Sequence, residues 1–431
     1  MDARVTSFAR AETIAVGTEL LALGTVDTNS GVIAERLATI GIDVIARSVV
    51  DDHLGHVELA VRTALQRADV VLITGGLGPT DDDLTRQAVA AALGREMHED
   101  AVQMSRITER FANRGLPMPE INRRQALLID GAVRLDNLHG TAPGQWIDLG
   151  PQAIVLLPGP PREMRPMLDG LVAGALGARA GDFRTYSRGL KVAGRSESWV
   201  ETTLQPLYAG WRAAPMPIEV TICAQFGRIE LHLFVRTDDP VAADATLSAA
   251  LTEATTALGP AVYTITDESL EDVAGRLLRS EGWRVSVAES CTGGMLGARL
   301  TDVPGSSAWV DGGVIAYSNA LKTVLAEVPA ALIAEHGAVS EPVALALAAG
   351  VRARCGTQVG IGITGIAGPD GGTDAKPVGT VFIALHTPAI VACRHARFVG
   401  DRAVVRHQSV SAALDMLRLA LTGHDPVGIA R

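Results

Sequence analysis

Residues Val285–Lys322 read VSVAESCTGGMLGARLTDVPGSSAWVDGGVIAYSNALK, and this stretch decides the fold of the C-terminal third of the chain. An apolar run ends at Glu289, the small residues Ser290–Gly294 follow, and Met295–Leu300 has helical character, which predicts a strand, a tight turn and a helix. Such a turn points backbone N–H groups at one position, and the N-terminus of a helix there favours an anion. The turn therefore predicts a binding site for a phosphate or carboxylate.

Three side chains beyond this turn could form a hydrolytic site. Ser307 follows a proline turn, Tyr317 follows a β-prone run, and Lys322 lies on a helix that Ser318 or Asn319 could cap. A serine becomes a strong nucleophile when a base takes its proton, and a lysine acts as that base only when burial or a nearby cation lowers its pKa. Spacing alone favours a structural interpretation, with Ser307 in a turn, Tyr317 in the core and Lys322 on a solvated helix face.

Length and composition predict a multidomain α/β protein. The chain has 431 residues, of which 47% are hydrophobic and 20% charged, enough for two or three ordinary cores. The formal charge of -10 argues against sequence-independent binding of nucleic acid, which depends on Lys and Arg neutralising phosphates.

We expect a soluble, cytoplasmic protein without structural metal or disulfides. Residues Met1–Arg10 lack the apolar core of a signal peptide, and no stretch approaches the roughly 18 apolar residues of a membrane span. The four cysteines are far apart without a C-x-x-C pair, and the ten histidines show no metal-ligand spacing.

The N-terminal third alternates predicted strands and helices, which implies a parallel sheet with helices on both faces and ligands at the carboxyl ends of its strands. The third strand runs into the glycine loop Thr74–Asp83, whose residues Gly75, Gly76 and Gly78 let phosphates approach the backbone. Three aspartates end this loop and would repel bare phosphate, so a divalent cation with oxygen ligands would reconcile the two. Alternatively, these aspartates only cap the helix at Leu84–Leu93.

Two further segments complete this prediction. The rigid turn Pro158–Pro161 could line the same pocket through Pro158 and Gly159, or be a plain strand-to-helix turn. Residues 171–262 combine strands and helices in an α+β module. Because it lacks the G-x-x-G loop with which RNA-binding KH domains clamp a backbone, we interpret it as a spacer and dimer contact.

The C-terminal third is similar to the CinA C-terminal family, the PncC-type amidases. The motifs AESCTGG, LTDVPGSSAW, GGVIAYSNALK, HGAVSEPVA, GITGIAGPDGG, KPVGTV and VGDR follow in that order across residues 287–402. The resemblance implies hydrolysis of the carboxamide of nicotinamide mononucleotide to the acid and ammonia, without a cofactor. It assigns Ser307 as the nucleophile, Lys322 as its base and Tyr317 as the hydroxyl that relays or orients the proton.

The same resemblance implies a substrate-binding set. Backbone N–H groups near Thr364–Gly368 would hold the oxyanion, and Arg402 would pair with the phosphate or stack on the ring. The residues expected to contact substrate are Ser290, Thr292, Gly293, Gly294, Thr364, Gly365 and Arg402. Cys291 competes as a nucleophile, because a cysteine at a helix N-terminus can have a lowered pKa, but we favour a small buried filler there.

The N-terminal third resembles the molybdopterin-binding fold of MoaB and MogA in its CinA version. The matching motifs are AVGTELL, DTNS, TGGLGPTDDDLT, NRRQALL, GTAPG and LLPGPPREM. The resemblance implies cleavage of ADP-ribose to AMP and ribose 5-phosphate with a divalent metal (Mg, Mn or Co), with Asp83 catalytic and Asp52 and Asp83 as metal ligands. Asp51 and His53 flank Asp52 where the family often has glycine and asparagine. The loop contacts would come from Gly75, Gly76, Gly78, Thr80, Pro158 and Gly159.

We therefore predict three domains: a MoaB/MogA-like parallel-sheet domain at 1–170, a KH-like module at 171–262 and an α/β amidase domain at 263–425. The predicted function is a bifunctional hydrolase of NAD-derived nucleotides that forms a homodimer, with neither membrane nor nucleic acid as partner. The alternative is a nucleotide-binding recruitment factor in competence or the DNA damage response, with a degenerate N-terminal site.

Overall fold

The computed structural model describes residues 7–225 and 227–428 and divides into two compact units. One unit comprises the chain up to Thr185 together with Arg236–Pro240, and the other comprises Tyr186–Val235 and the chain from Val241 onward. The first unit extends past the predicted boundary at residue 170, because Leu171 and Leu176 pack into the core of that unit. The middle α+β module and the C-terminal domain share the second unit.

The first unit is a six-stranded sheet of order β2-β1-β3-β8-β7-β6. Strands β2, β1, β3 and β8 are parallel, whereas β7 and β6 run antiparallel at one edge. The predicted parallel sheet is thus confirmed, with an antiparallel edge that the sequence pattern did not indicate. The strands are β1 (Arg10–Val16), β2 (Asp43–Val50), β3 (Val70–Thr74), β6 (Ala132–Leu135), β7 (Gly144–Asp148) and β8 (Ala153–Leu157), beside a small pair of β4 (Met97–Glu99) and β5 (Leu127–Ile129).

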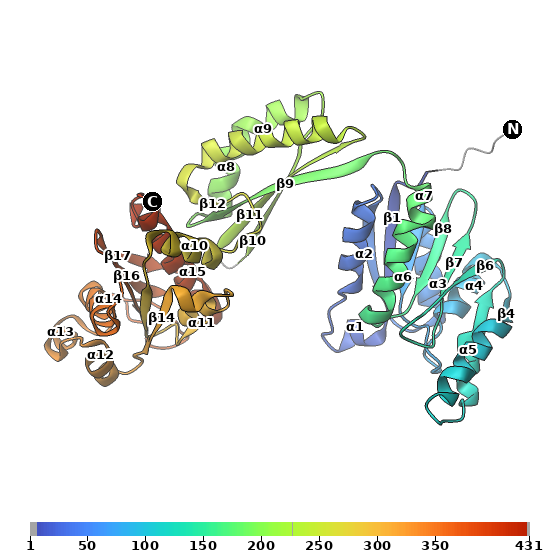
Figure 1. The fold of residues 1–431 in the computed structure, drawn as a ribbon, viewed down its shortest axis with the longest axis horizontal. Coiled ribbons are helices and arrows are strands. Elements are labelled where there is room, and N and C mark those ends of the chain that lie inside the picture. The colour runs from blue at the N-terminus through green and yellow to red at the C-terminus, as the bar shows by residue number, and fades with distance from the viewer. Residues whose placement is uncertain (1–6, 226, 429–431) are drawn as a thin grey trace. The chain divides into compact units, whose positions relative to one another are not determined.

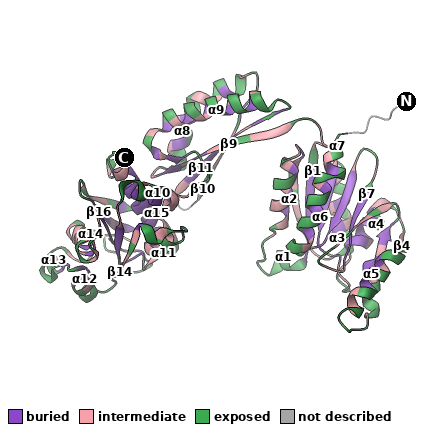
Figure 2. Cartoon of the chain, viewed as in Figure 1, coloured by how far each residue is buried: buried purple, intermediate pink, exposed green. Residues whose placement is uncertain are grey.

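Helices cover both faces of this sheet (Figure 1). Strands β3 and β8 are buried along their whole length, because apolar side chains extend from both of their faces. Figure 2 colours the strands at the centre of this sheet mostly as buried. Two cores result, one under α3 (Leu54–Ala64) and α4 (Thr85–Leu93), the other under α2 (Asn29–Ala38) and α6 (Pro161–Ala173). The remaining helices are α1 (Thr18–Ala22), α5 (Ala101–Ala112), α7 (Ala175–Arg179) and the 3-10 helix η1 (Glu120–Ala126).

The second unit begins with a four-stranded sheet of order β10-β11-β9-β12. Helices α8 (Glu197–Ala213) and α9 (Pro240–Leu258) share one apolar core with it and lie along one of its faces (Figure 1). This is the expected α+β module. Its strands are β9 (Arg184–Ala193), β10 (Glu219–Gln225), β11 (Arg228–Thr237) and β12 (Val262–Thr264), with η2 at Gly259–Ala261.

The C-terminal part is a five-stranded sheet of order β14-β13-β15-β16-β17 between two helical layers. Strands β14, β13 and β15 are parallel, and β16 and β17 are antiparallel. The strands are β13 (Val285–Glu289), β14 (Val310–Ile315), β15 (Val359–Gly365), β16 (Thr380–His386) and β17 (Val391–Arg397). The helices are α10 (Leu270–Glu281), α11 (Met295–Thr301), α12 (Asn319–Ala326), α13 (Ala330–His336), α14 (Glu341–Cys355) and α15 (Arg402–Leu421), with η3 at Ser306–Ala308.

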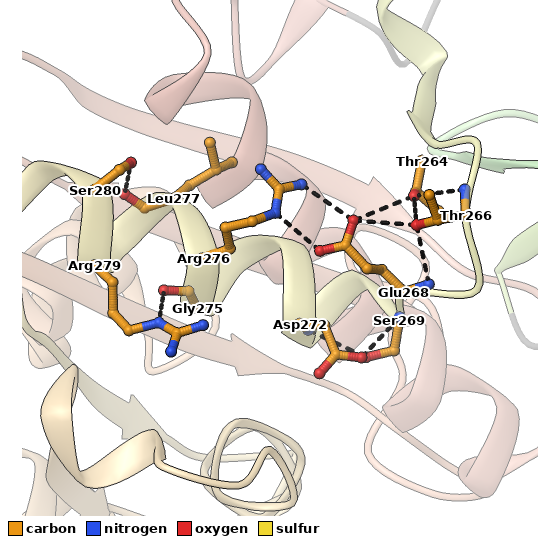
Figure 3. Close-up of polar contacts among 10 residues, drawn as sticks. All are labelled: Thr264, Thr266, Glu268, Ser269, Asp272, Gly275, Arg276, Leu277, Arg279 and Ser280. Carbon is orange, nitrogen blue, oxygen red and sulfur yellow. Dashed lines mark hydrogen bonds and ion pairs between the residues drawn. The ribbon is translucent and has the colours of Figure 1, made fainter.

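Helix α10 opens this domain with a capping box (Figure 3). The Ser269 hydroxyl accepts from the Asp272 N–H, and the Asp272 carboxylate accepts from the Ser269 N–H. Just upstream, Glu268 accepts from Arg276 at 2.8 Å and so fixes the chain to the second turn of the helix. Two carboxylates in the first turn also complement the helix dipole.

Within the described residues, no helix combines the length and apolarity needed to cross a membrane.

Candidate functional site

The carboxyl ends of β13 and β14 bring the turn after Glu289 next to α12. Lys322, on α12, is only 2% exposed. Its Nζ donates to the Ser290 hydroxyl at 3.1 Å and to the carbonyls of Ala316 at 3.1 Å and Tyr317 at 3.2 Å. Lys322 is therefore neither a solvated surface charge nor a partner of Ser307.

Burial has the largest effect on the pKa of the Lys322 amine. Desolvation lowers the pKa of Lys322 below its usual value, since charge is costly in a low-dielectric surrounding. Among the residues that the structure describes, Lys322 forms no ion pair with a carboxylate that would offset this effect. The geometry therefore joins a serine hydroxyl to an amine that loses its proton more readily than an ordinary lysine.

Ser307 lies at the opposite end of these strands, where β13 and β14 begin. It belongs to η3, which precedes β14, and its carbonyl accepts from Arg284, the residue before β13. Strands β13 and β14 are parallel and start together, with Val285 paired to Val310. The six residues of β14 therefore separate the amino and carboxyl ends of these strands by roughly 20 Å, at about 3.3 Å per residue. Within this chain, the predicted pairing of Ser307 with Lys322 is wrong, because strand direction carries them to different ends.

The hydroxyl of Tyr317 is bound to an arginine instead of the lysine. Arg402, the first residue of α15, donates from Nη2 to the Tyr317 hydroxyl at 3.1 Å and from Nη1 to the Gly368 carbonyl at 2.8 Å. One turn later, Arg406 donates to the Thr292 carbonyl at 2.7 Å. The start of α15 thus connects Tyr317 to the turn at Thr292 and to the turn at Gly368.

The N-terminus of α11 holds an internal anion. Glu289 is 1% exposed, and its carboxylate accepts from the N–H groups of Gly294 at 3.1 Å, Leu296 at 3.0 Å and Gly297 at 2.8 Å. The prediction that these amides bind a ligand anion is therefore corrected, because the last residue of β13 already supplies the negative charge. The carboxylate also braces the turn that carries Ser290.

The remaining predicted contacts lie close by. Thr292 is fully buried and Gly293 approaches Arg406. Thr364 and Gly365 end β15, beside the end of β13, but the Thr364 hydroxyl donates to the Ala338 carbonyl at 2.7 Å. Thr364 therefore holds the neighbouring chain in place.

Cys291 is 6% exposed, and burial raises the pKa of its thiol to about 11. A thiol with that pKa stays protonated at neutral pH, so the interpretation as a buried filler is supported over a thiolate nucleophile.

A second candidate site lies in the first unit, in a cavity of about 750 Å³ at the carboxyl ends of the parallel strands. It collects most of the residues predicted there, namely Asp52, Gly75, Gly76, Gly78, Asp83, Pro158 and Gly159, whereas Thr80 is outside the lining. Two further parts of the lining were not among the predicted residues: Asn29, whose Nδ2 donates to the Gly159 carbonyl at 2.7 Å, and the segment His139–Ala142. The motifs DTNS and GTAPG were the available signals.

Asp83 organises the glycine loop. Its carboxylate accepts from the N–H groups of Gly78 at 2.7 Å and Thr80 at 2.8 Å and from the Thr80 hydroxyl. Helix α4 begins after Leu84 without a side-chain cap from any residue in the described part of the chain. Helix capping therefore does not explain the aspartates.

Asp52 and Asp83 line the same cavity and are the side chains that could hold a divalent cation together with a substrate. Asp52 accepts from the Thr18 N–H at 2.7 Å and hydroxyl at 2.9 Å, and lines the same cavity as Asp83. In the described ranges, no three His, Cys, Asp or Glu side chains group closely enough to hold a metal on their own. Magnesium commonly takes one or two carboxylates and completes its shell with water and substrate phosphates, so two aspartates suffice.

The two residues that flank Asp52, Asp51 and His53, both contact His56. Asp51 meets His56 Nδ1 at 2.6 Å, and this contact is the main cause that lowers the pKa of Asp51. The rings of His53 and His56 lie 4.5 Å apart. The departure from the family pattern therefore forms a small surface cluster beside Asp52.

Comparison with known proteins follows the same division of the chain. Residues 267–421 match the family model of the CinA C-terminal domain, and residues 12–178 match the probable molybdopterin binding domain. A CinA-like protein of Acidobacterium capsulatum is 42% identical over 419 residues, which cover 95% of this chain and 99% of that protein. A CinA-like protein of Koribacter versatilis is 42% identical over 415 residues, with 95% and 99% covered. A solved competence-damaged protein (CinA) superfamily protein of Klebsiella pneumoniae is 34% identical, covering 36% of this chain and 99% of its own, with a TM-score of 0.35.

Proposed function

This chain belongs to the CinA family, and from that premise we propose that it is a hydrolase of NAD-derived nucleotides with one site in each unit. The C-terminal site would deamidate nicotinamide mononucleotide to nicotinate mononucleotide and ammonia. The N-terminal site would cleave ADP-ribose to AMP and ribose 5-phosphate.

The contact between Lys322 Nζ and the Ser290 hydroxyl carries the amidase proposal. Ser290 Oγ attacks the carboxamide carbon while its proton passes to the neutral amine of Lys322. The tetrahedral intermediate then expels its nitrogen, which takes that proton and leaves as ammonia. Water attacks the resulting ester and gives a proton to Lys322, which returns it to Ser290 Oγ as the acid departs.

Arg402 and Tyr317 support binding and orientation in this proposal. Arg402 donates to the Tyr317 hydroxyl and offers a guanidinium that can pair with the nucleotide phosphate. Its bond to the Tyr317 hydroxyl fixes that ring beside the lysine-bearing helix. Tyr317 therefore orients the site, while Lys322 alone supplies the base.

The amidase should depend on pH through Lys322. Only the neutral amine accepts a proton, so kcat/KM should rise with pH through the folded-state pKa of Lys322 and level off above it. Because burial lowers this pKa, we expect the midpoint of the rise in kcat/KM to lie at a pH below 10.5, the ordinary pKa of lysine. Ammonia release measured across pH tests this, and a rise centred at or above the ordinary lysine pKa would contradict it.

For the N-terminal site, the glycine loop and two aspartates at one cavity support the proposal. Asp52 and Asp83 would hold a divalent cation, which supplies neutralisation of the pyrophosphate charge when bound. The glycines admit the phosphates close to the backbone, and Asn29 holds the turn at Gly159 that forms the facing wall.

Chelation should separate the two activities. Treatment with EDTA should abolish AMP formation from ADP-ribose, because the carboxylates would then face the pyrophosphate without a cation between them. Ammonia release from nicotinamide mononucleotide should stay within twofold of the untreated enzyme. Both products are measured in the same preparation, and equal loss of both would count against separate sites.

The alternative of a nucleotide-binding recruitment factor has one observation in its favour. Asp83 already accepts three hydrogen bonds from its own loop, which suits a site that holds a nucleotide without cleaving it. Purified protein that binds ADP-ribose yet forms neither AMP nor ammonia would favour this alternative. A homodimer remains our proposal for the assembly, and light scattering on the full chain tests it.

A further inference from the structure

A buried arginine lies under the glycine loop of the first unit. Arg86, the second residue of α4, is 0% exposed. Its Nη1 donates to the Leu77 carbonyl at 2.7 Å and its Nη2 to the Gly78 carbonyl at 3.0 Å, while Nε has no hydrogen-bond partner in the described part of the chain. Nothing in the sequence pattern distinguished this residue from an ordinary helix charge.

The guanidinium carries its charge without an ion pair to any described carboxylate. Burial lowers the pKa of Arg86 to about 10, and the charge of Asp83 opposes that shift. Arg86 therefore stays cationic at neutral pH. A buried charge without a carboxylate partner is costly, and the two hydrogen bonds to carbonyls offset only part of that cost. A role in stability alone does not explain an arginine at this position.

Arg86 and Asp83 hold the same peptide groups from two sides. The Gly78 N–H donates to Asp83, and the Gly78 carbonyl accepts from Arg86. Since Arg86 is fully buried, the Leu77 and Gly78 carbonyls that it binds are directed into the protein. Left free to face the cavity, these oxygens would repel a phosphate.

The cavity also has an excess of negative side chains. Three arginines line it, at positions 110, 114 and 162, against six carboxylates: Glu19, Asp27, Asp52, Asp82, Asp83 and Glu163. An anionic ligand therefore needs additional positive charge nearby. A cation inside the protein is screened less by salt and water than one on the surface.

We propose that Arg86 is a positioning residue of the N-terminal site, which turns the Leu77 and Gly78 carbonyls away from the cavity and supplies the buried positive charge that lets a pyrophosphate lie beside Asp83. This inference rests on the proposed function of the same site. It concerns how the loop accepts the anion, so it applies to binding as well as cleavage.

The test compares binding with stability in the full-length protein. Arg86→Met should weaken binding of ADP-ribose and of inorganic pyrophosphate at least tenfold, measured by calorimetry at a temperature at which the melting curve shows the variant to be folded. Arg86→Lys keeps the charge and should bind both ligands within about threefold of the natural protein. Arg62→Met is the control, since Arg62 also donates to a carbonyl, but that carbonyl belongs to Ala91, which lies outside the cavity lining, whereas Leu77 and Gly78 belong to it.

Several results would overturn the inference. One is Arg86→Met binding both ligands as tightly as the natural protein, and another is Arg86→Lys binding no better than Arg86→Met. If Arg86→Met does not fold, Arg86→Gln replaces it, and Arg86→Lys binding no tighter than Arg86→Gln is decisive against the charge. A natural protein that binds neither ligand removes both proposals. One that binds pyrophosphate in an Arg86-dependent way but releases no AMP removes the proposed cleavage and leaves this inference standing.

Discussion

Replacing Ser290 by alanine should lower deamidation of nicotinamide mononucleotide about 10³-fold or more, while Ser307→Ala should remain within threefold of the natural protein. Removing a nucleophile from a unit of cooperating groups usually costs several orders of magnitude. The expectation rests on the 3.1 Å contact of the Ser290 hydroxyl with Lys322 Nζ and on the position of Ser307 at the other edge of the sheet.

The measurement is steady-state ammonia release by both variants, with melting temperatures to confirm folding. Ser290 loses only its hydroxyl, and the bracing of its turn by Glu289 is unchanged, so the melting temperature should shift little. The reverse ranking, with Ser290→Ala active and Ser307→Ala inactive, would restore Ser307 and require a partner subunit to bring it to the lysine.

Replacing Lys322 by methionine should be as damaging, at about 10³-fold or more in kcat. The methionine fills a similar volume, and the variant loses the group that takes the proton from Ser290. Lys322→Arg should be equally inactive, because a guanidinium keeps its proton in proteins and cannot act as the base. If Lys322 had only a structural role, Lys322→Arg would retain activity, because arginine also donates to carbonyls.

The matched control for the two Lys322 variants is Lys191→Met. Lys191 Nζ also donates to two carbonyls, those of Asp267 at 3.0 Å and Glu268 at 3.4 Å, but meets no serine at the candidate site. Its activity should stay within twofold of the natural protein. Activity in Lys322→Arg above about a tenth of the natural rate would remove Lys322 as the base.

Local pattern was sufficient to predict the elements that hold both sites. Alternation of apolar strands with helices indicated layered α/β units, and Ser318 caps α12 as the sequence suggested. The glycine-rich segments lie at strand ends: the turn after Glu289 follows β13, the turn after Gly365 follows β15, and the glycine loop of the first unit follows β3. The antiparallel strands β6 and β7 were not anticipated, because runs of four and five residues carry little periodic signal. Helix α5 was not anticipated either.

The sequence by itself determined the layers and the loops, because strand and helix periods and turn residues act over a few neighbours. The resemblance of its motifs to the CinA C-terminal family singled out Lys322. Only the tertiary structure decided which serine meets that lysine, since Ser290 and Lys322 are 32 residues apart and meet through the parallel pairing of β13 with β14. It likewise decided that Glu289 occupies the start of α11 and that Arg86 lies beneath the glycine loop. Such contacts depend on strand direction, register and burial, which long-range packing sets and no local spacing encodes.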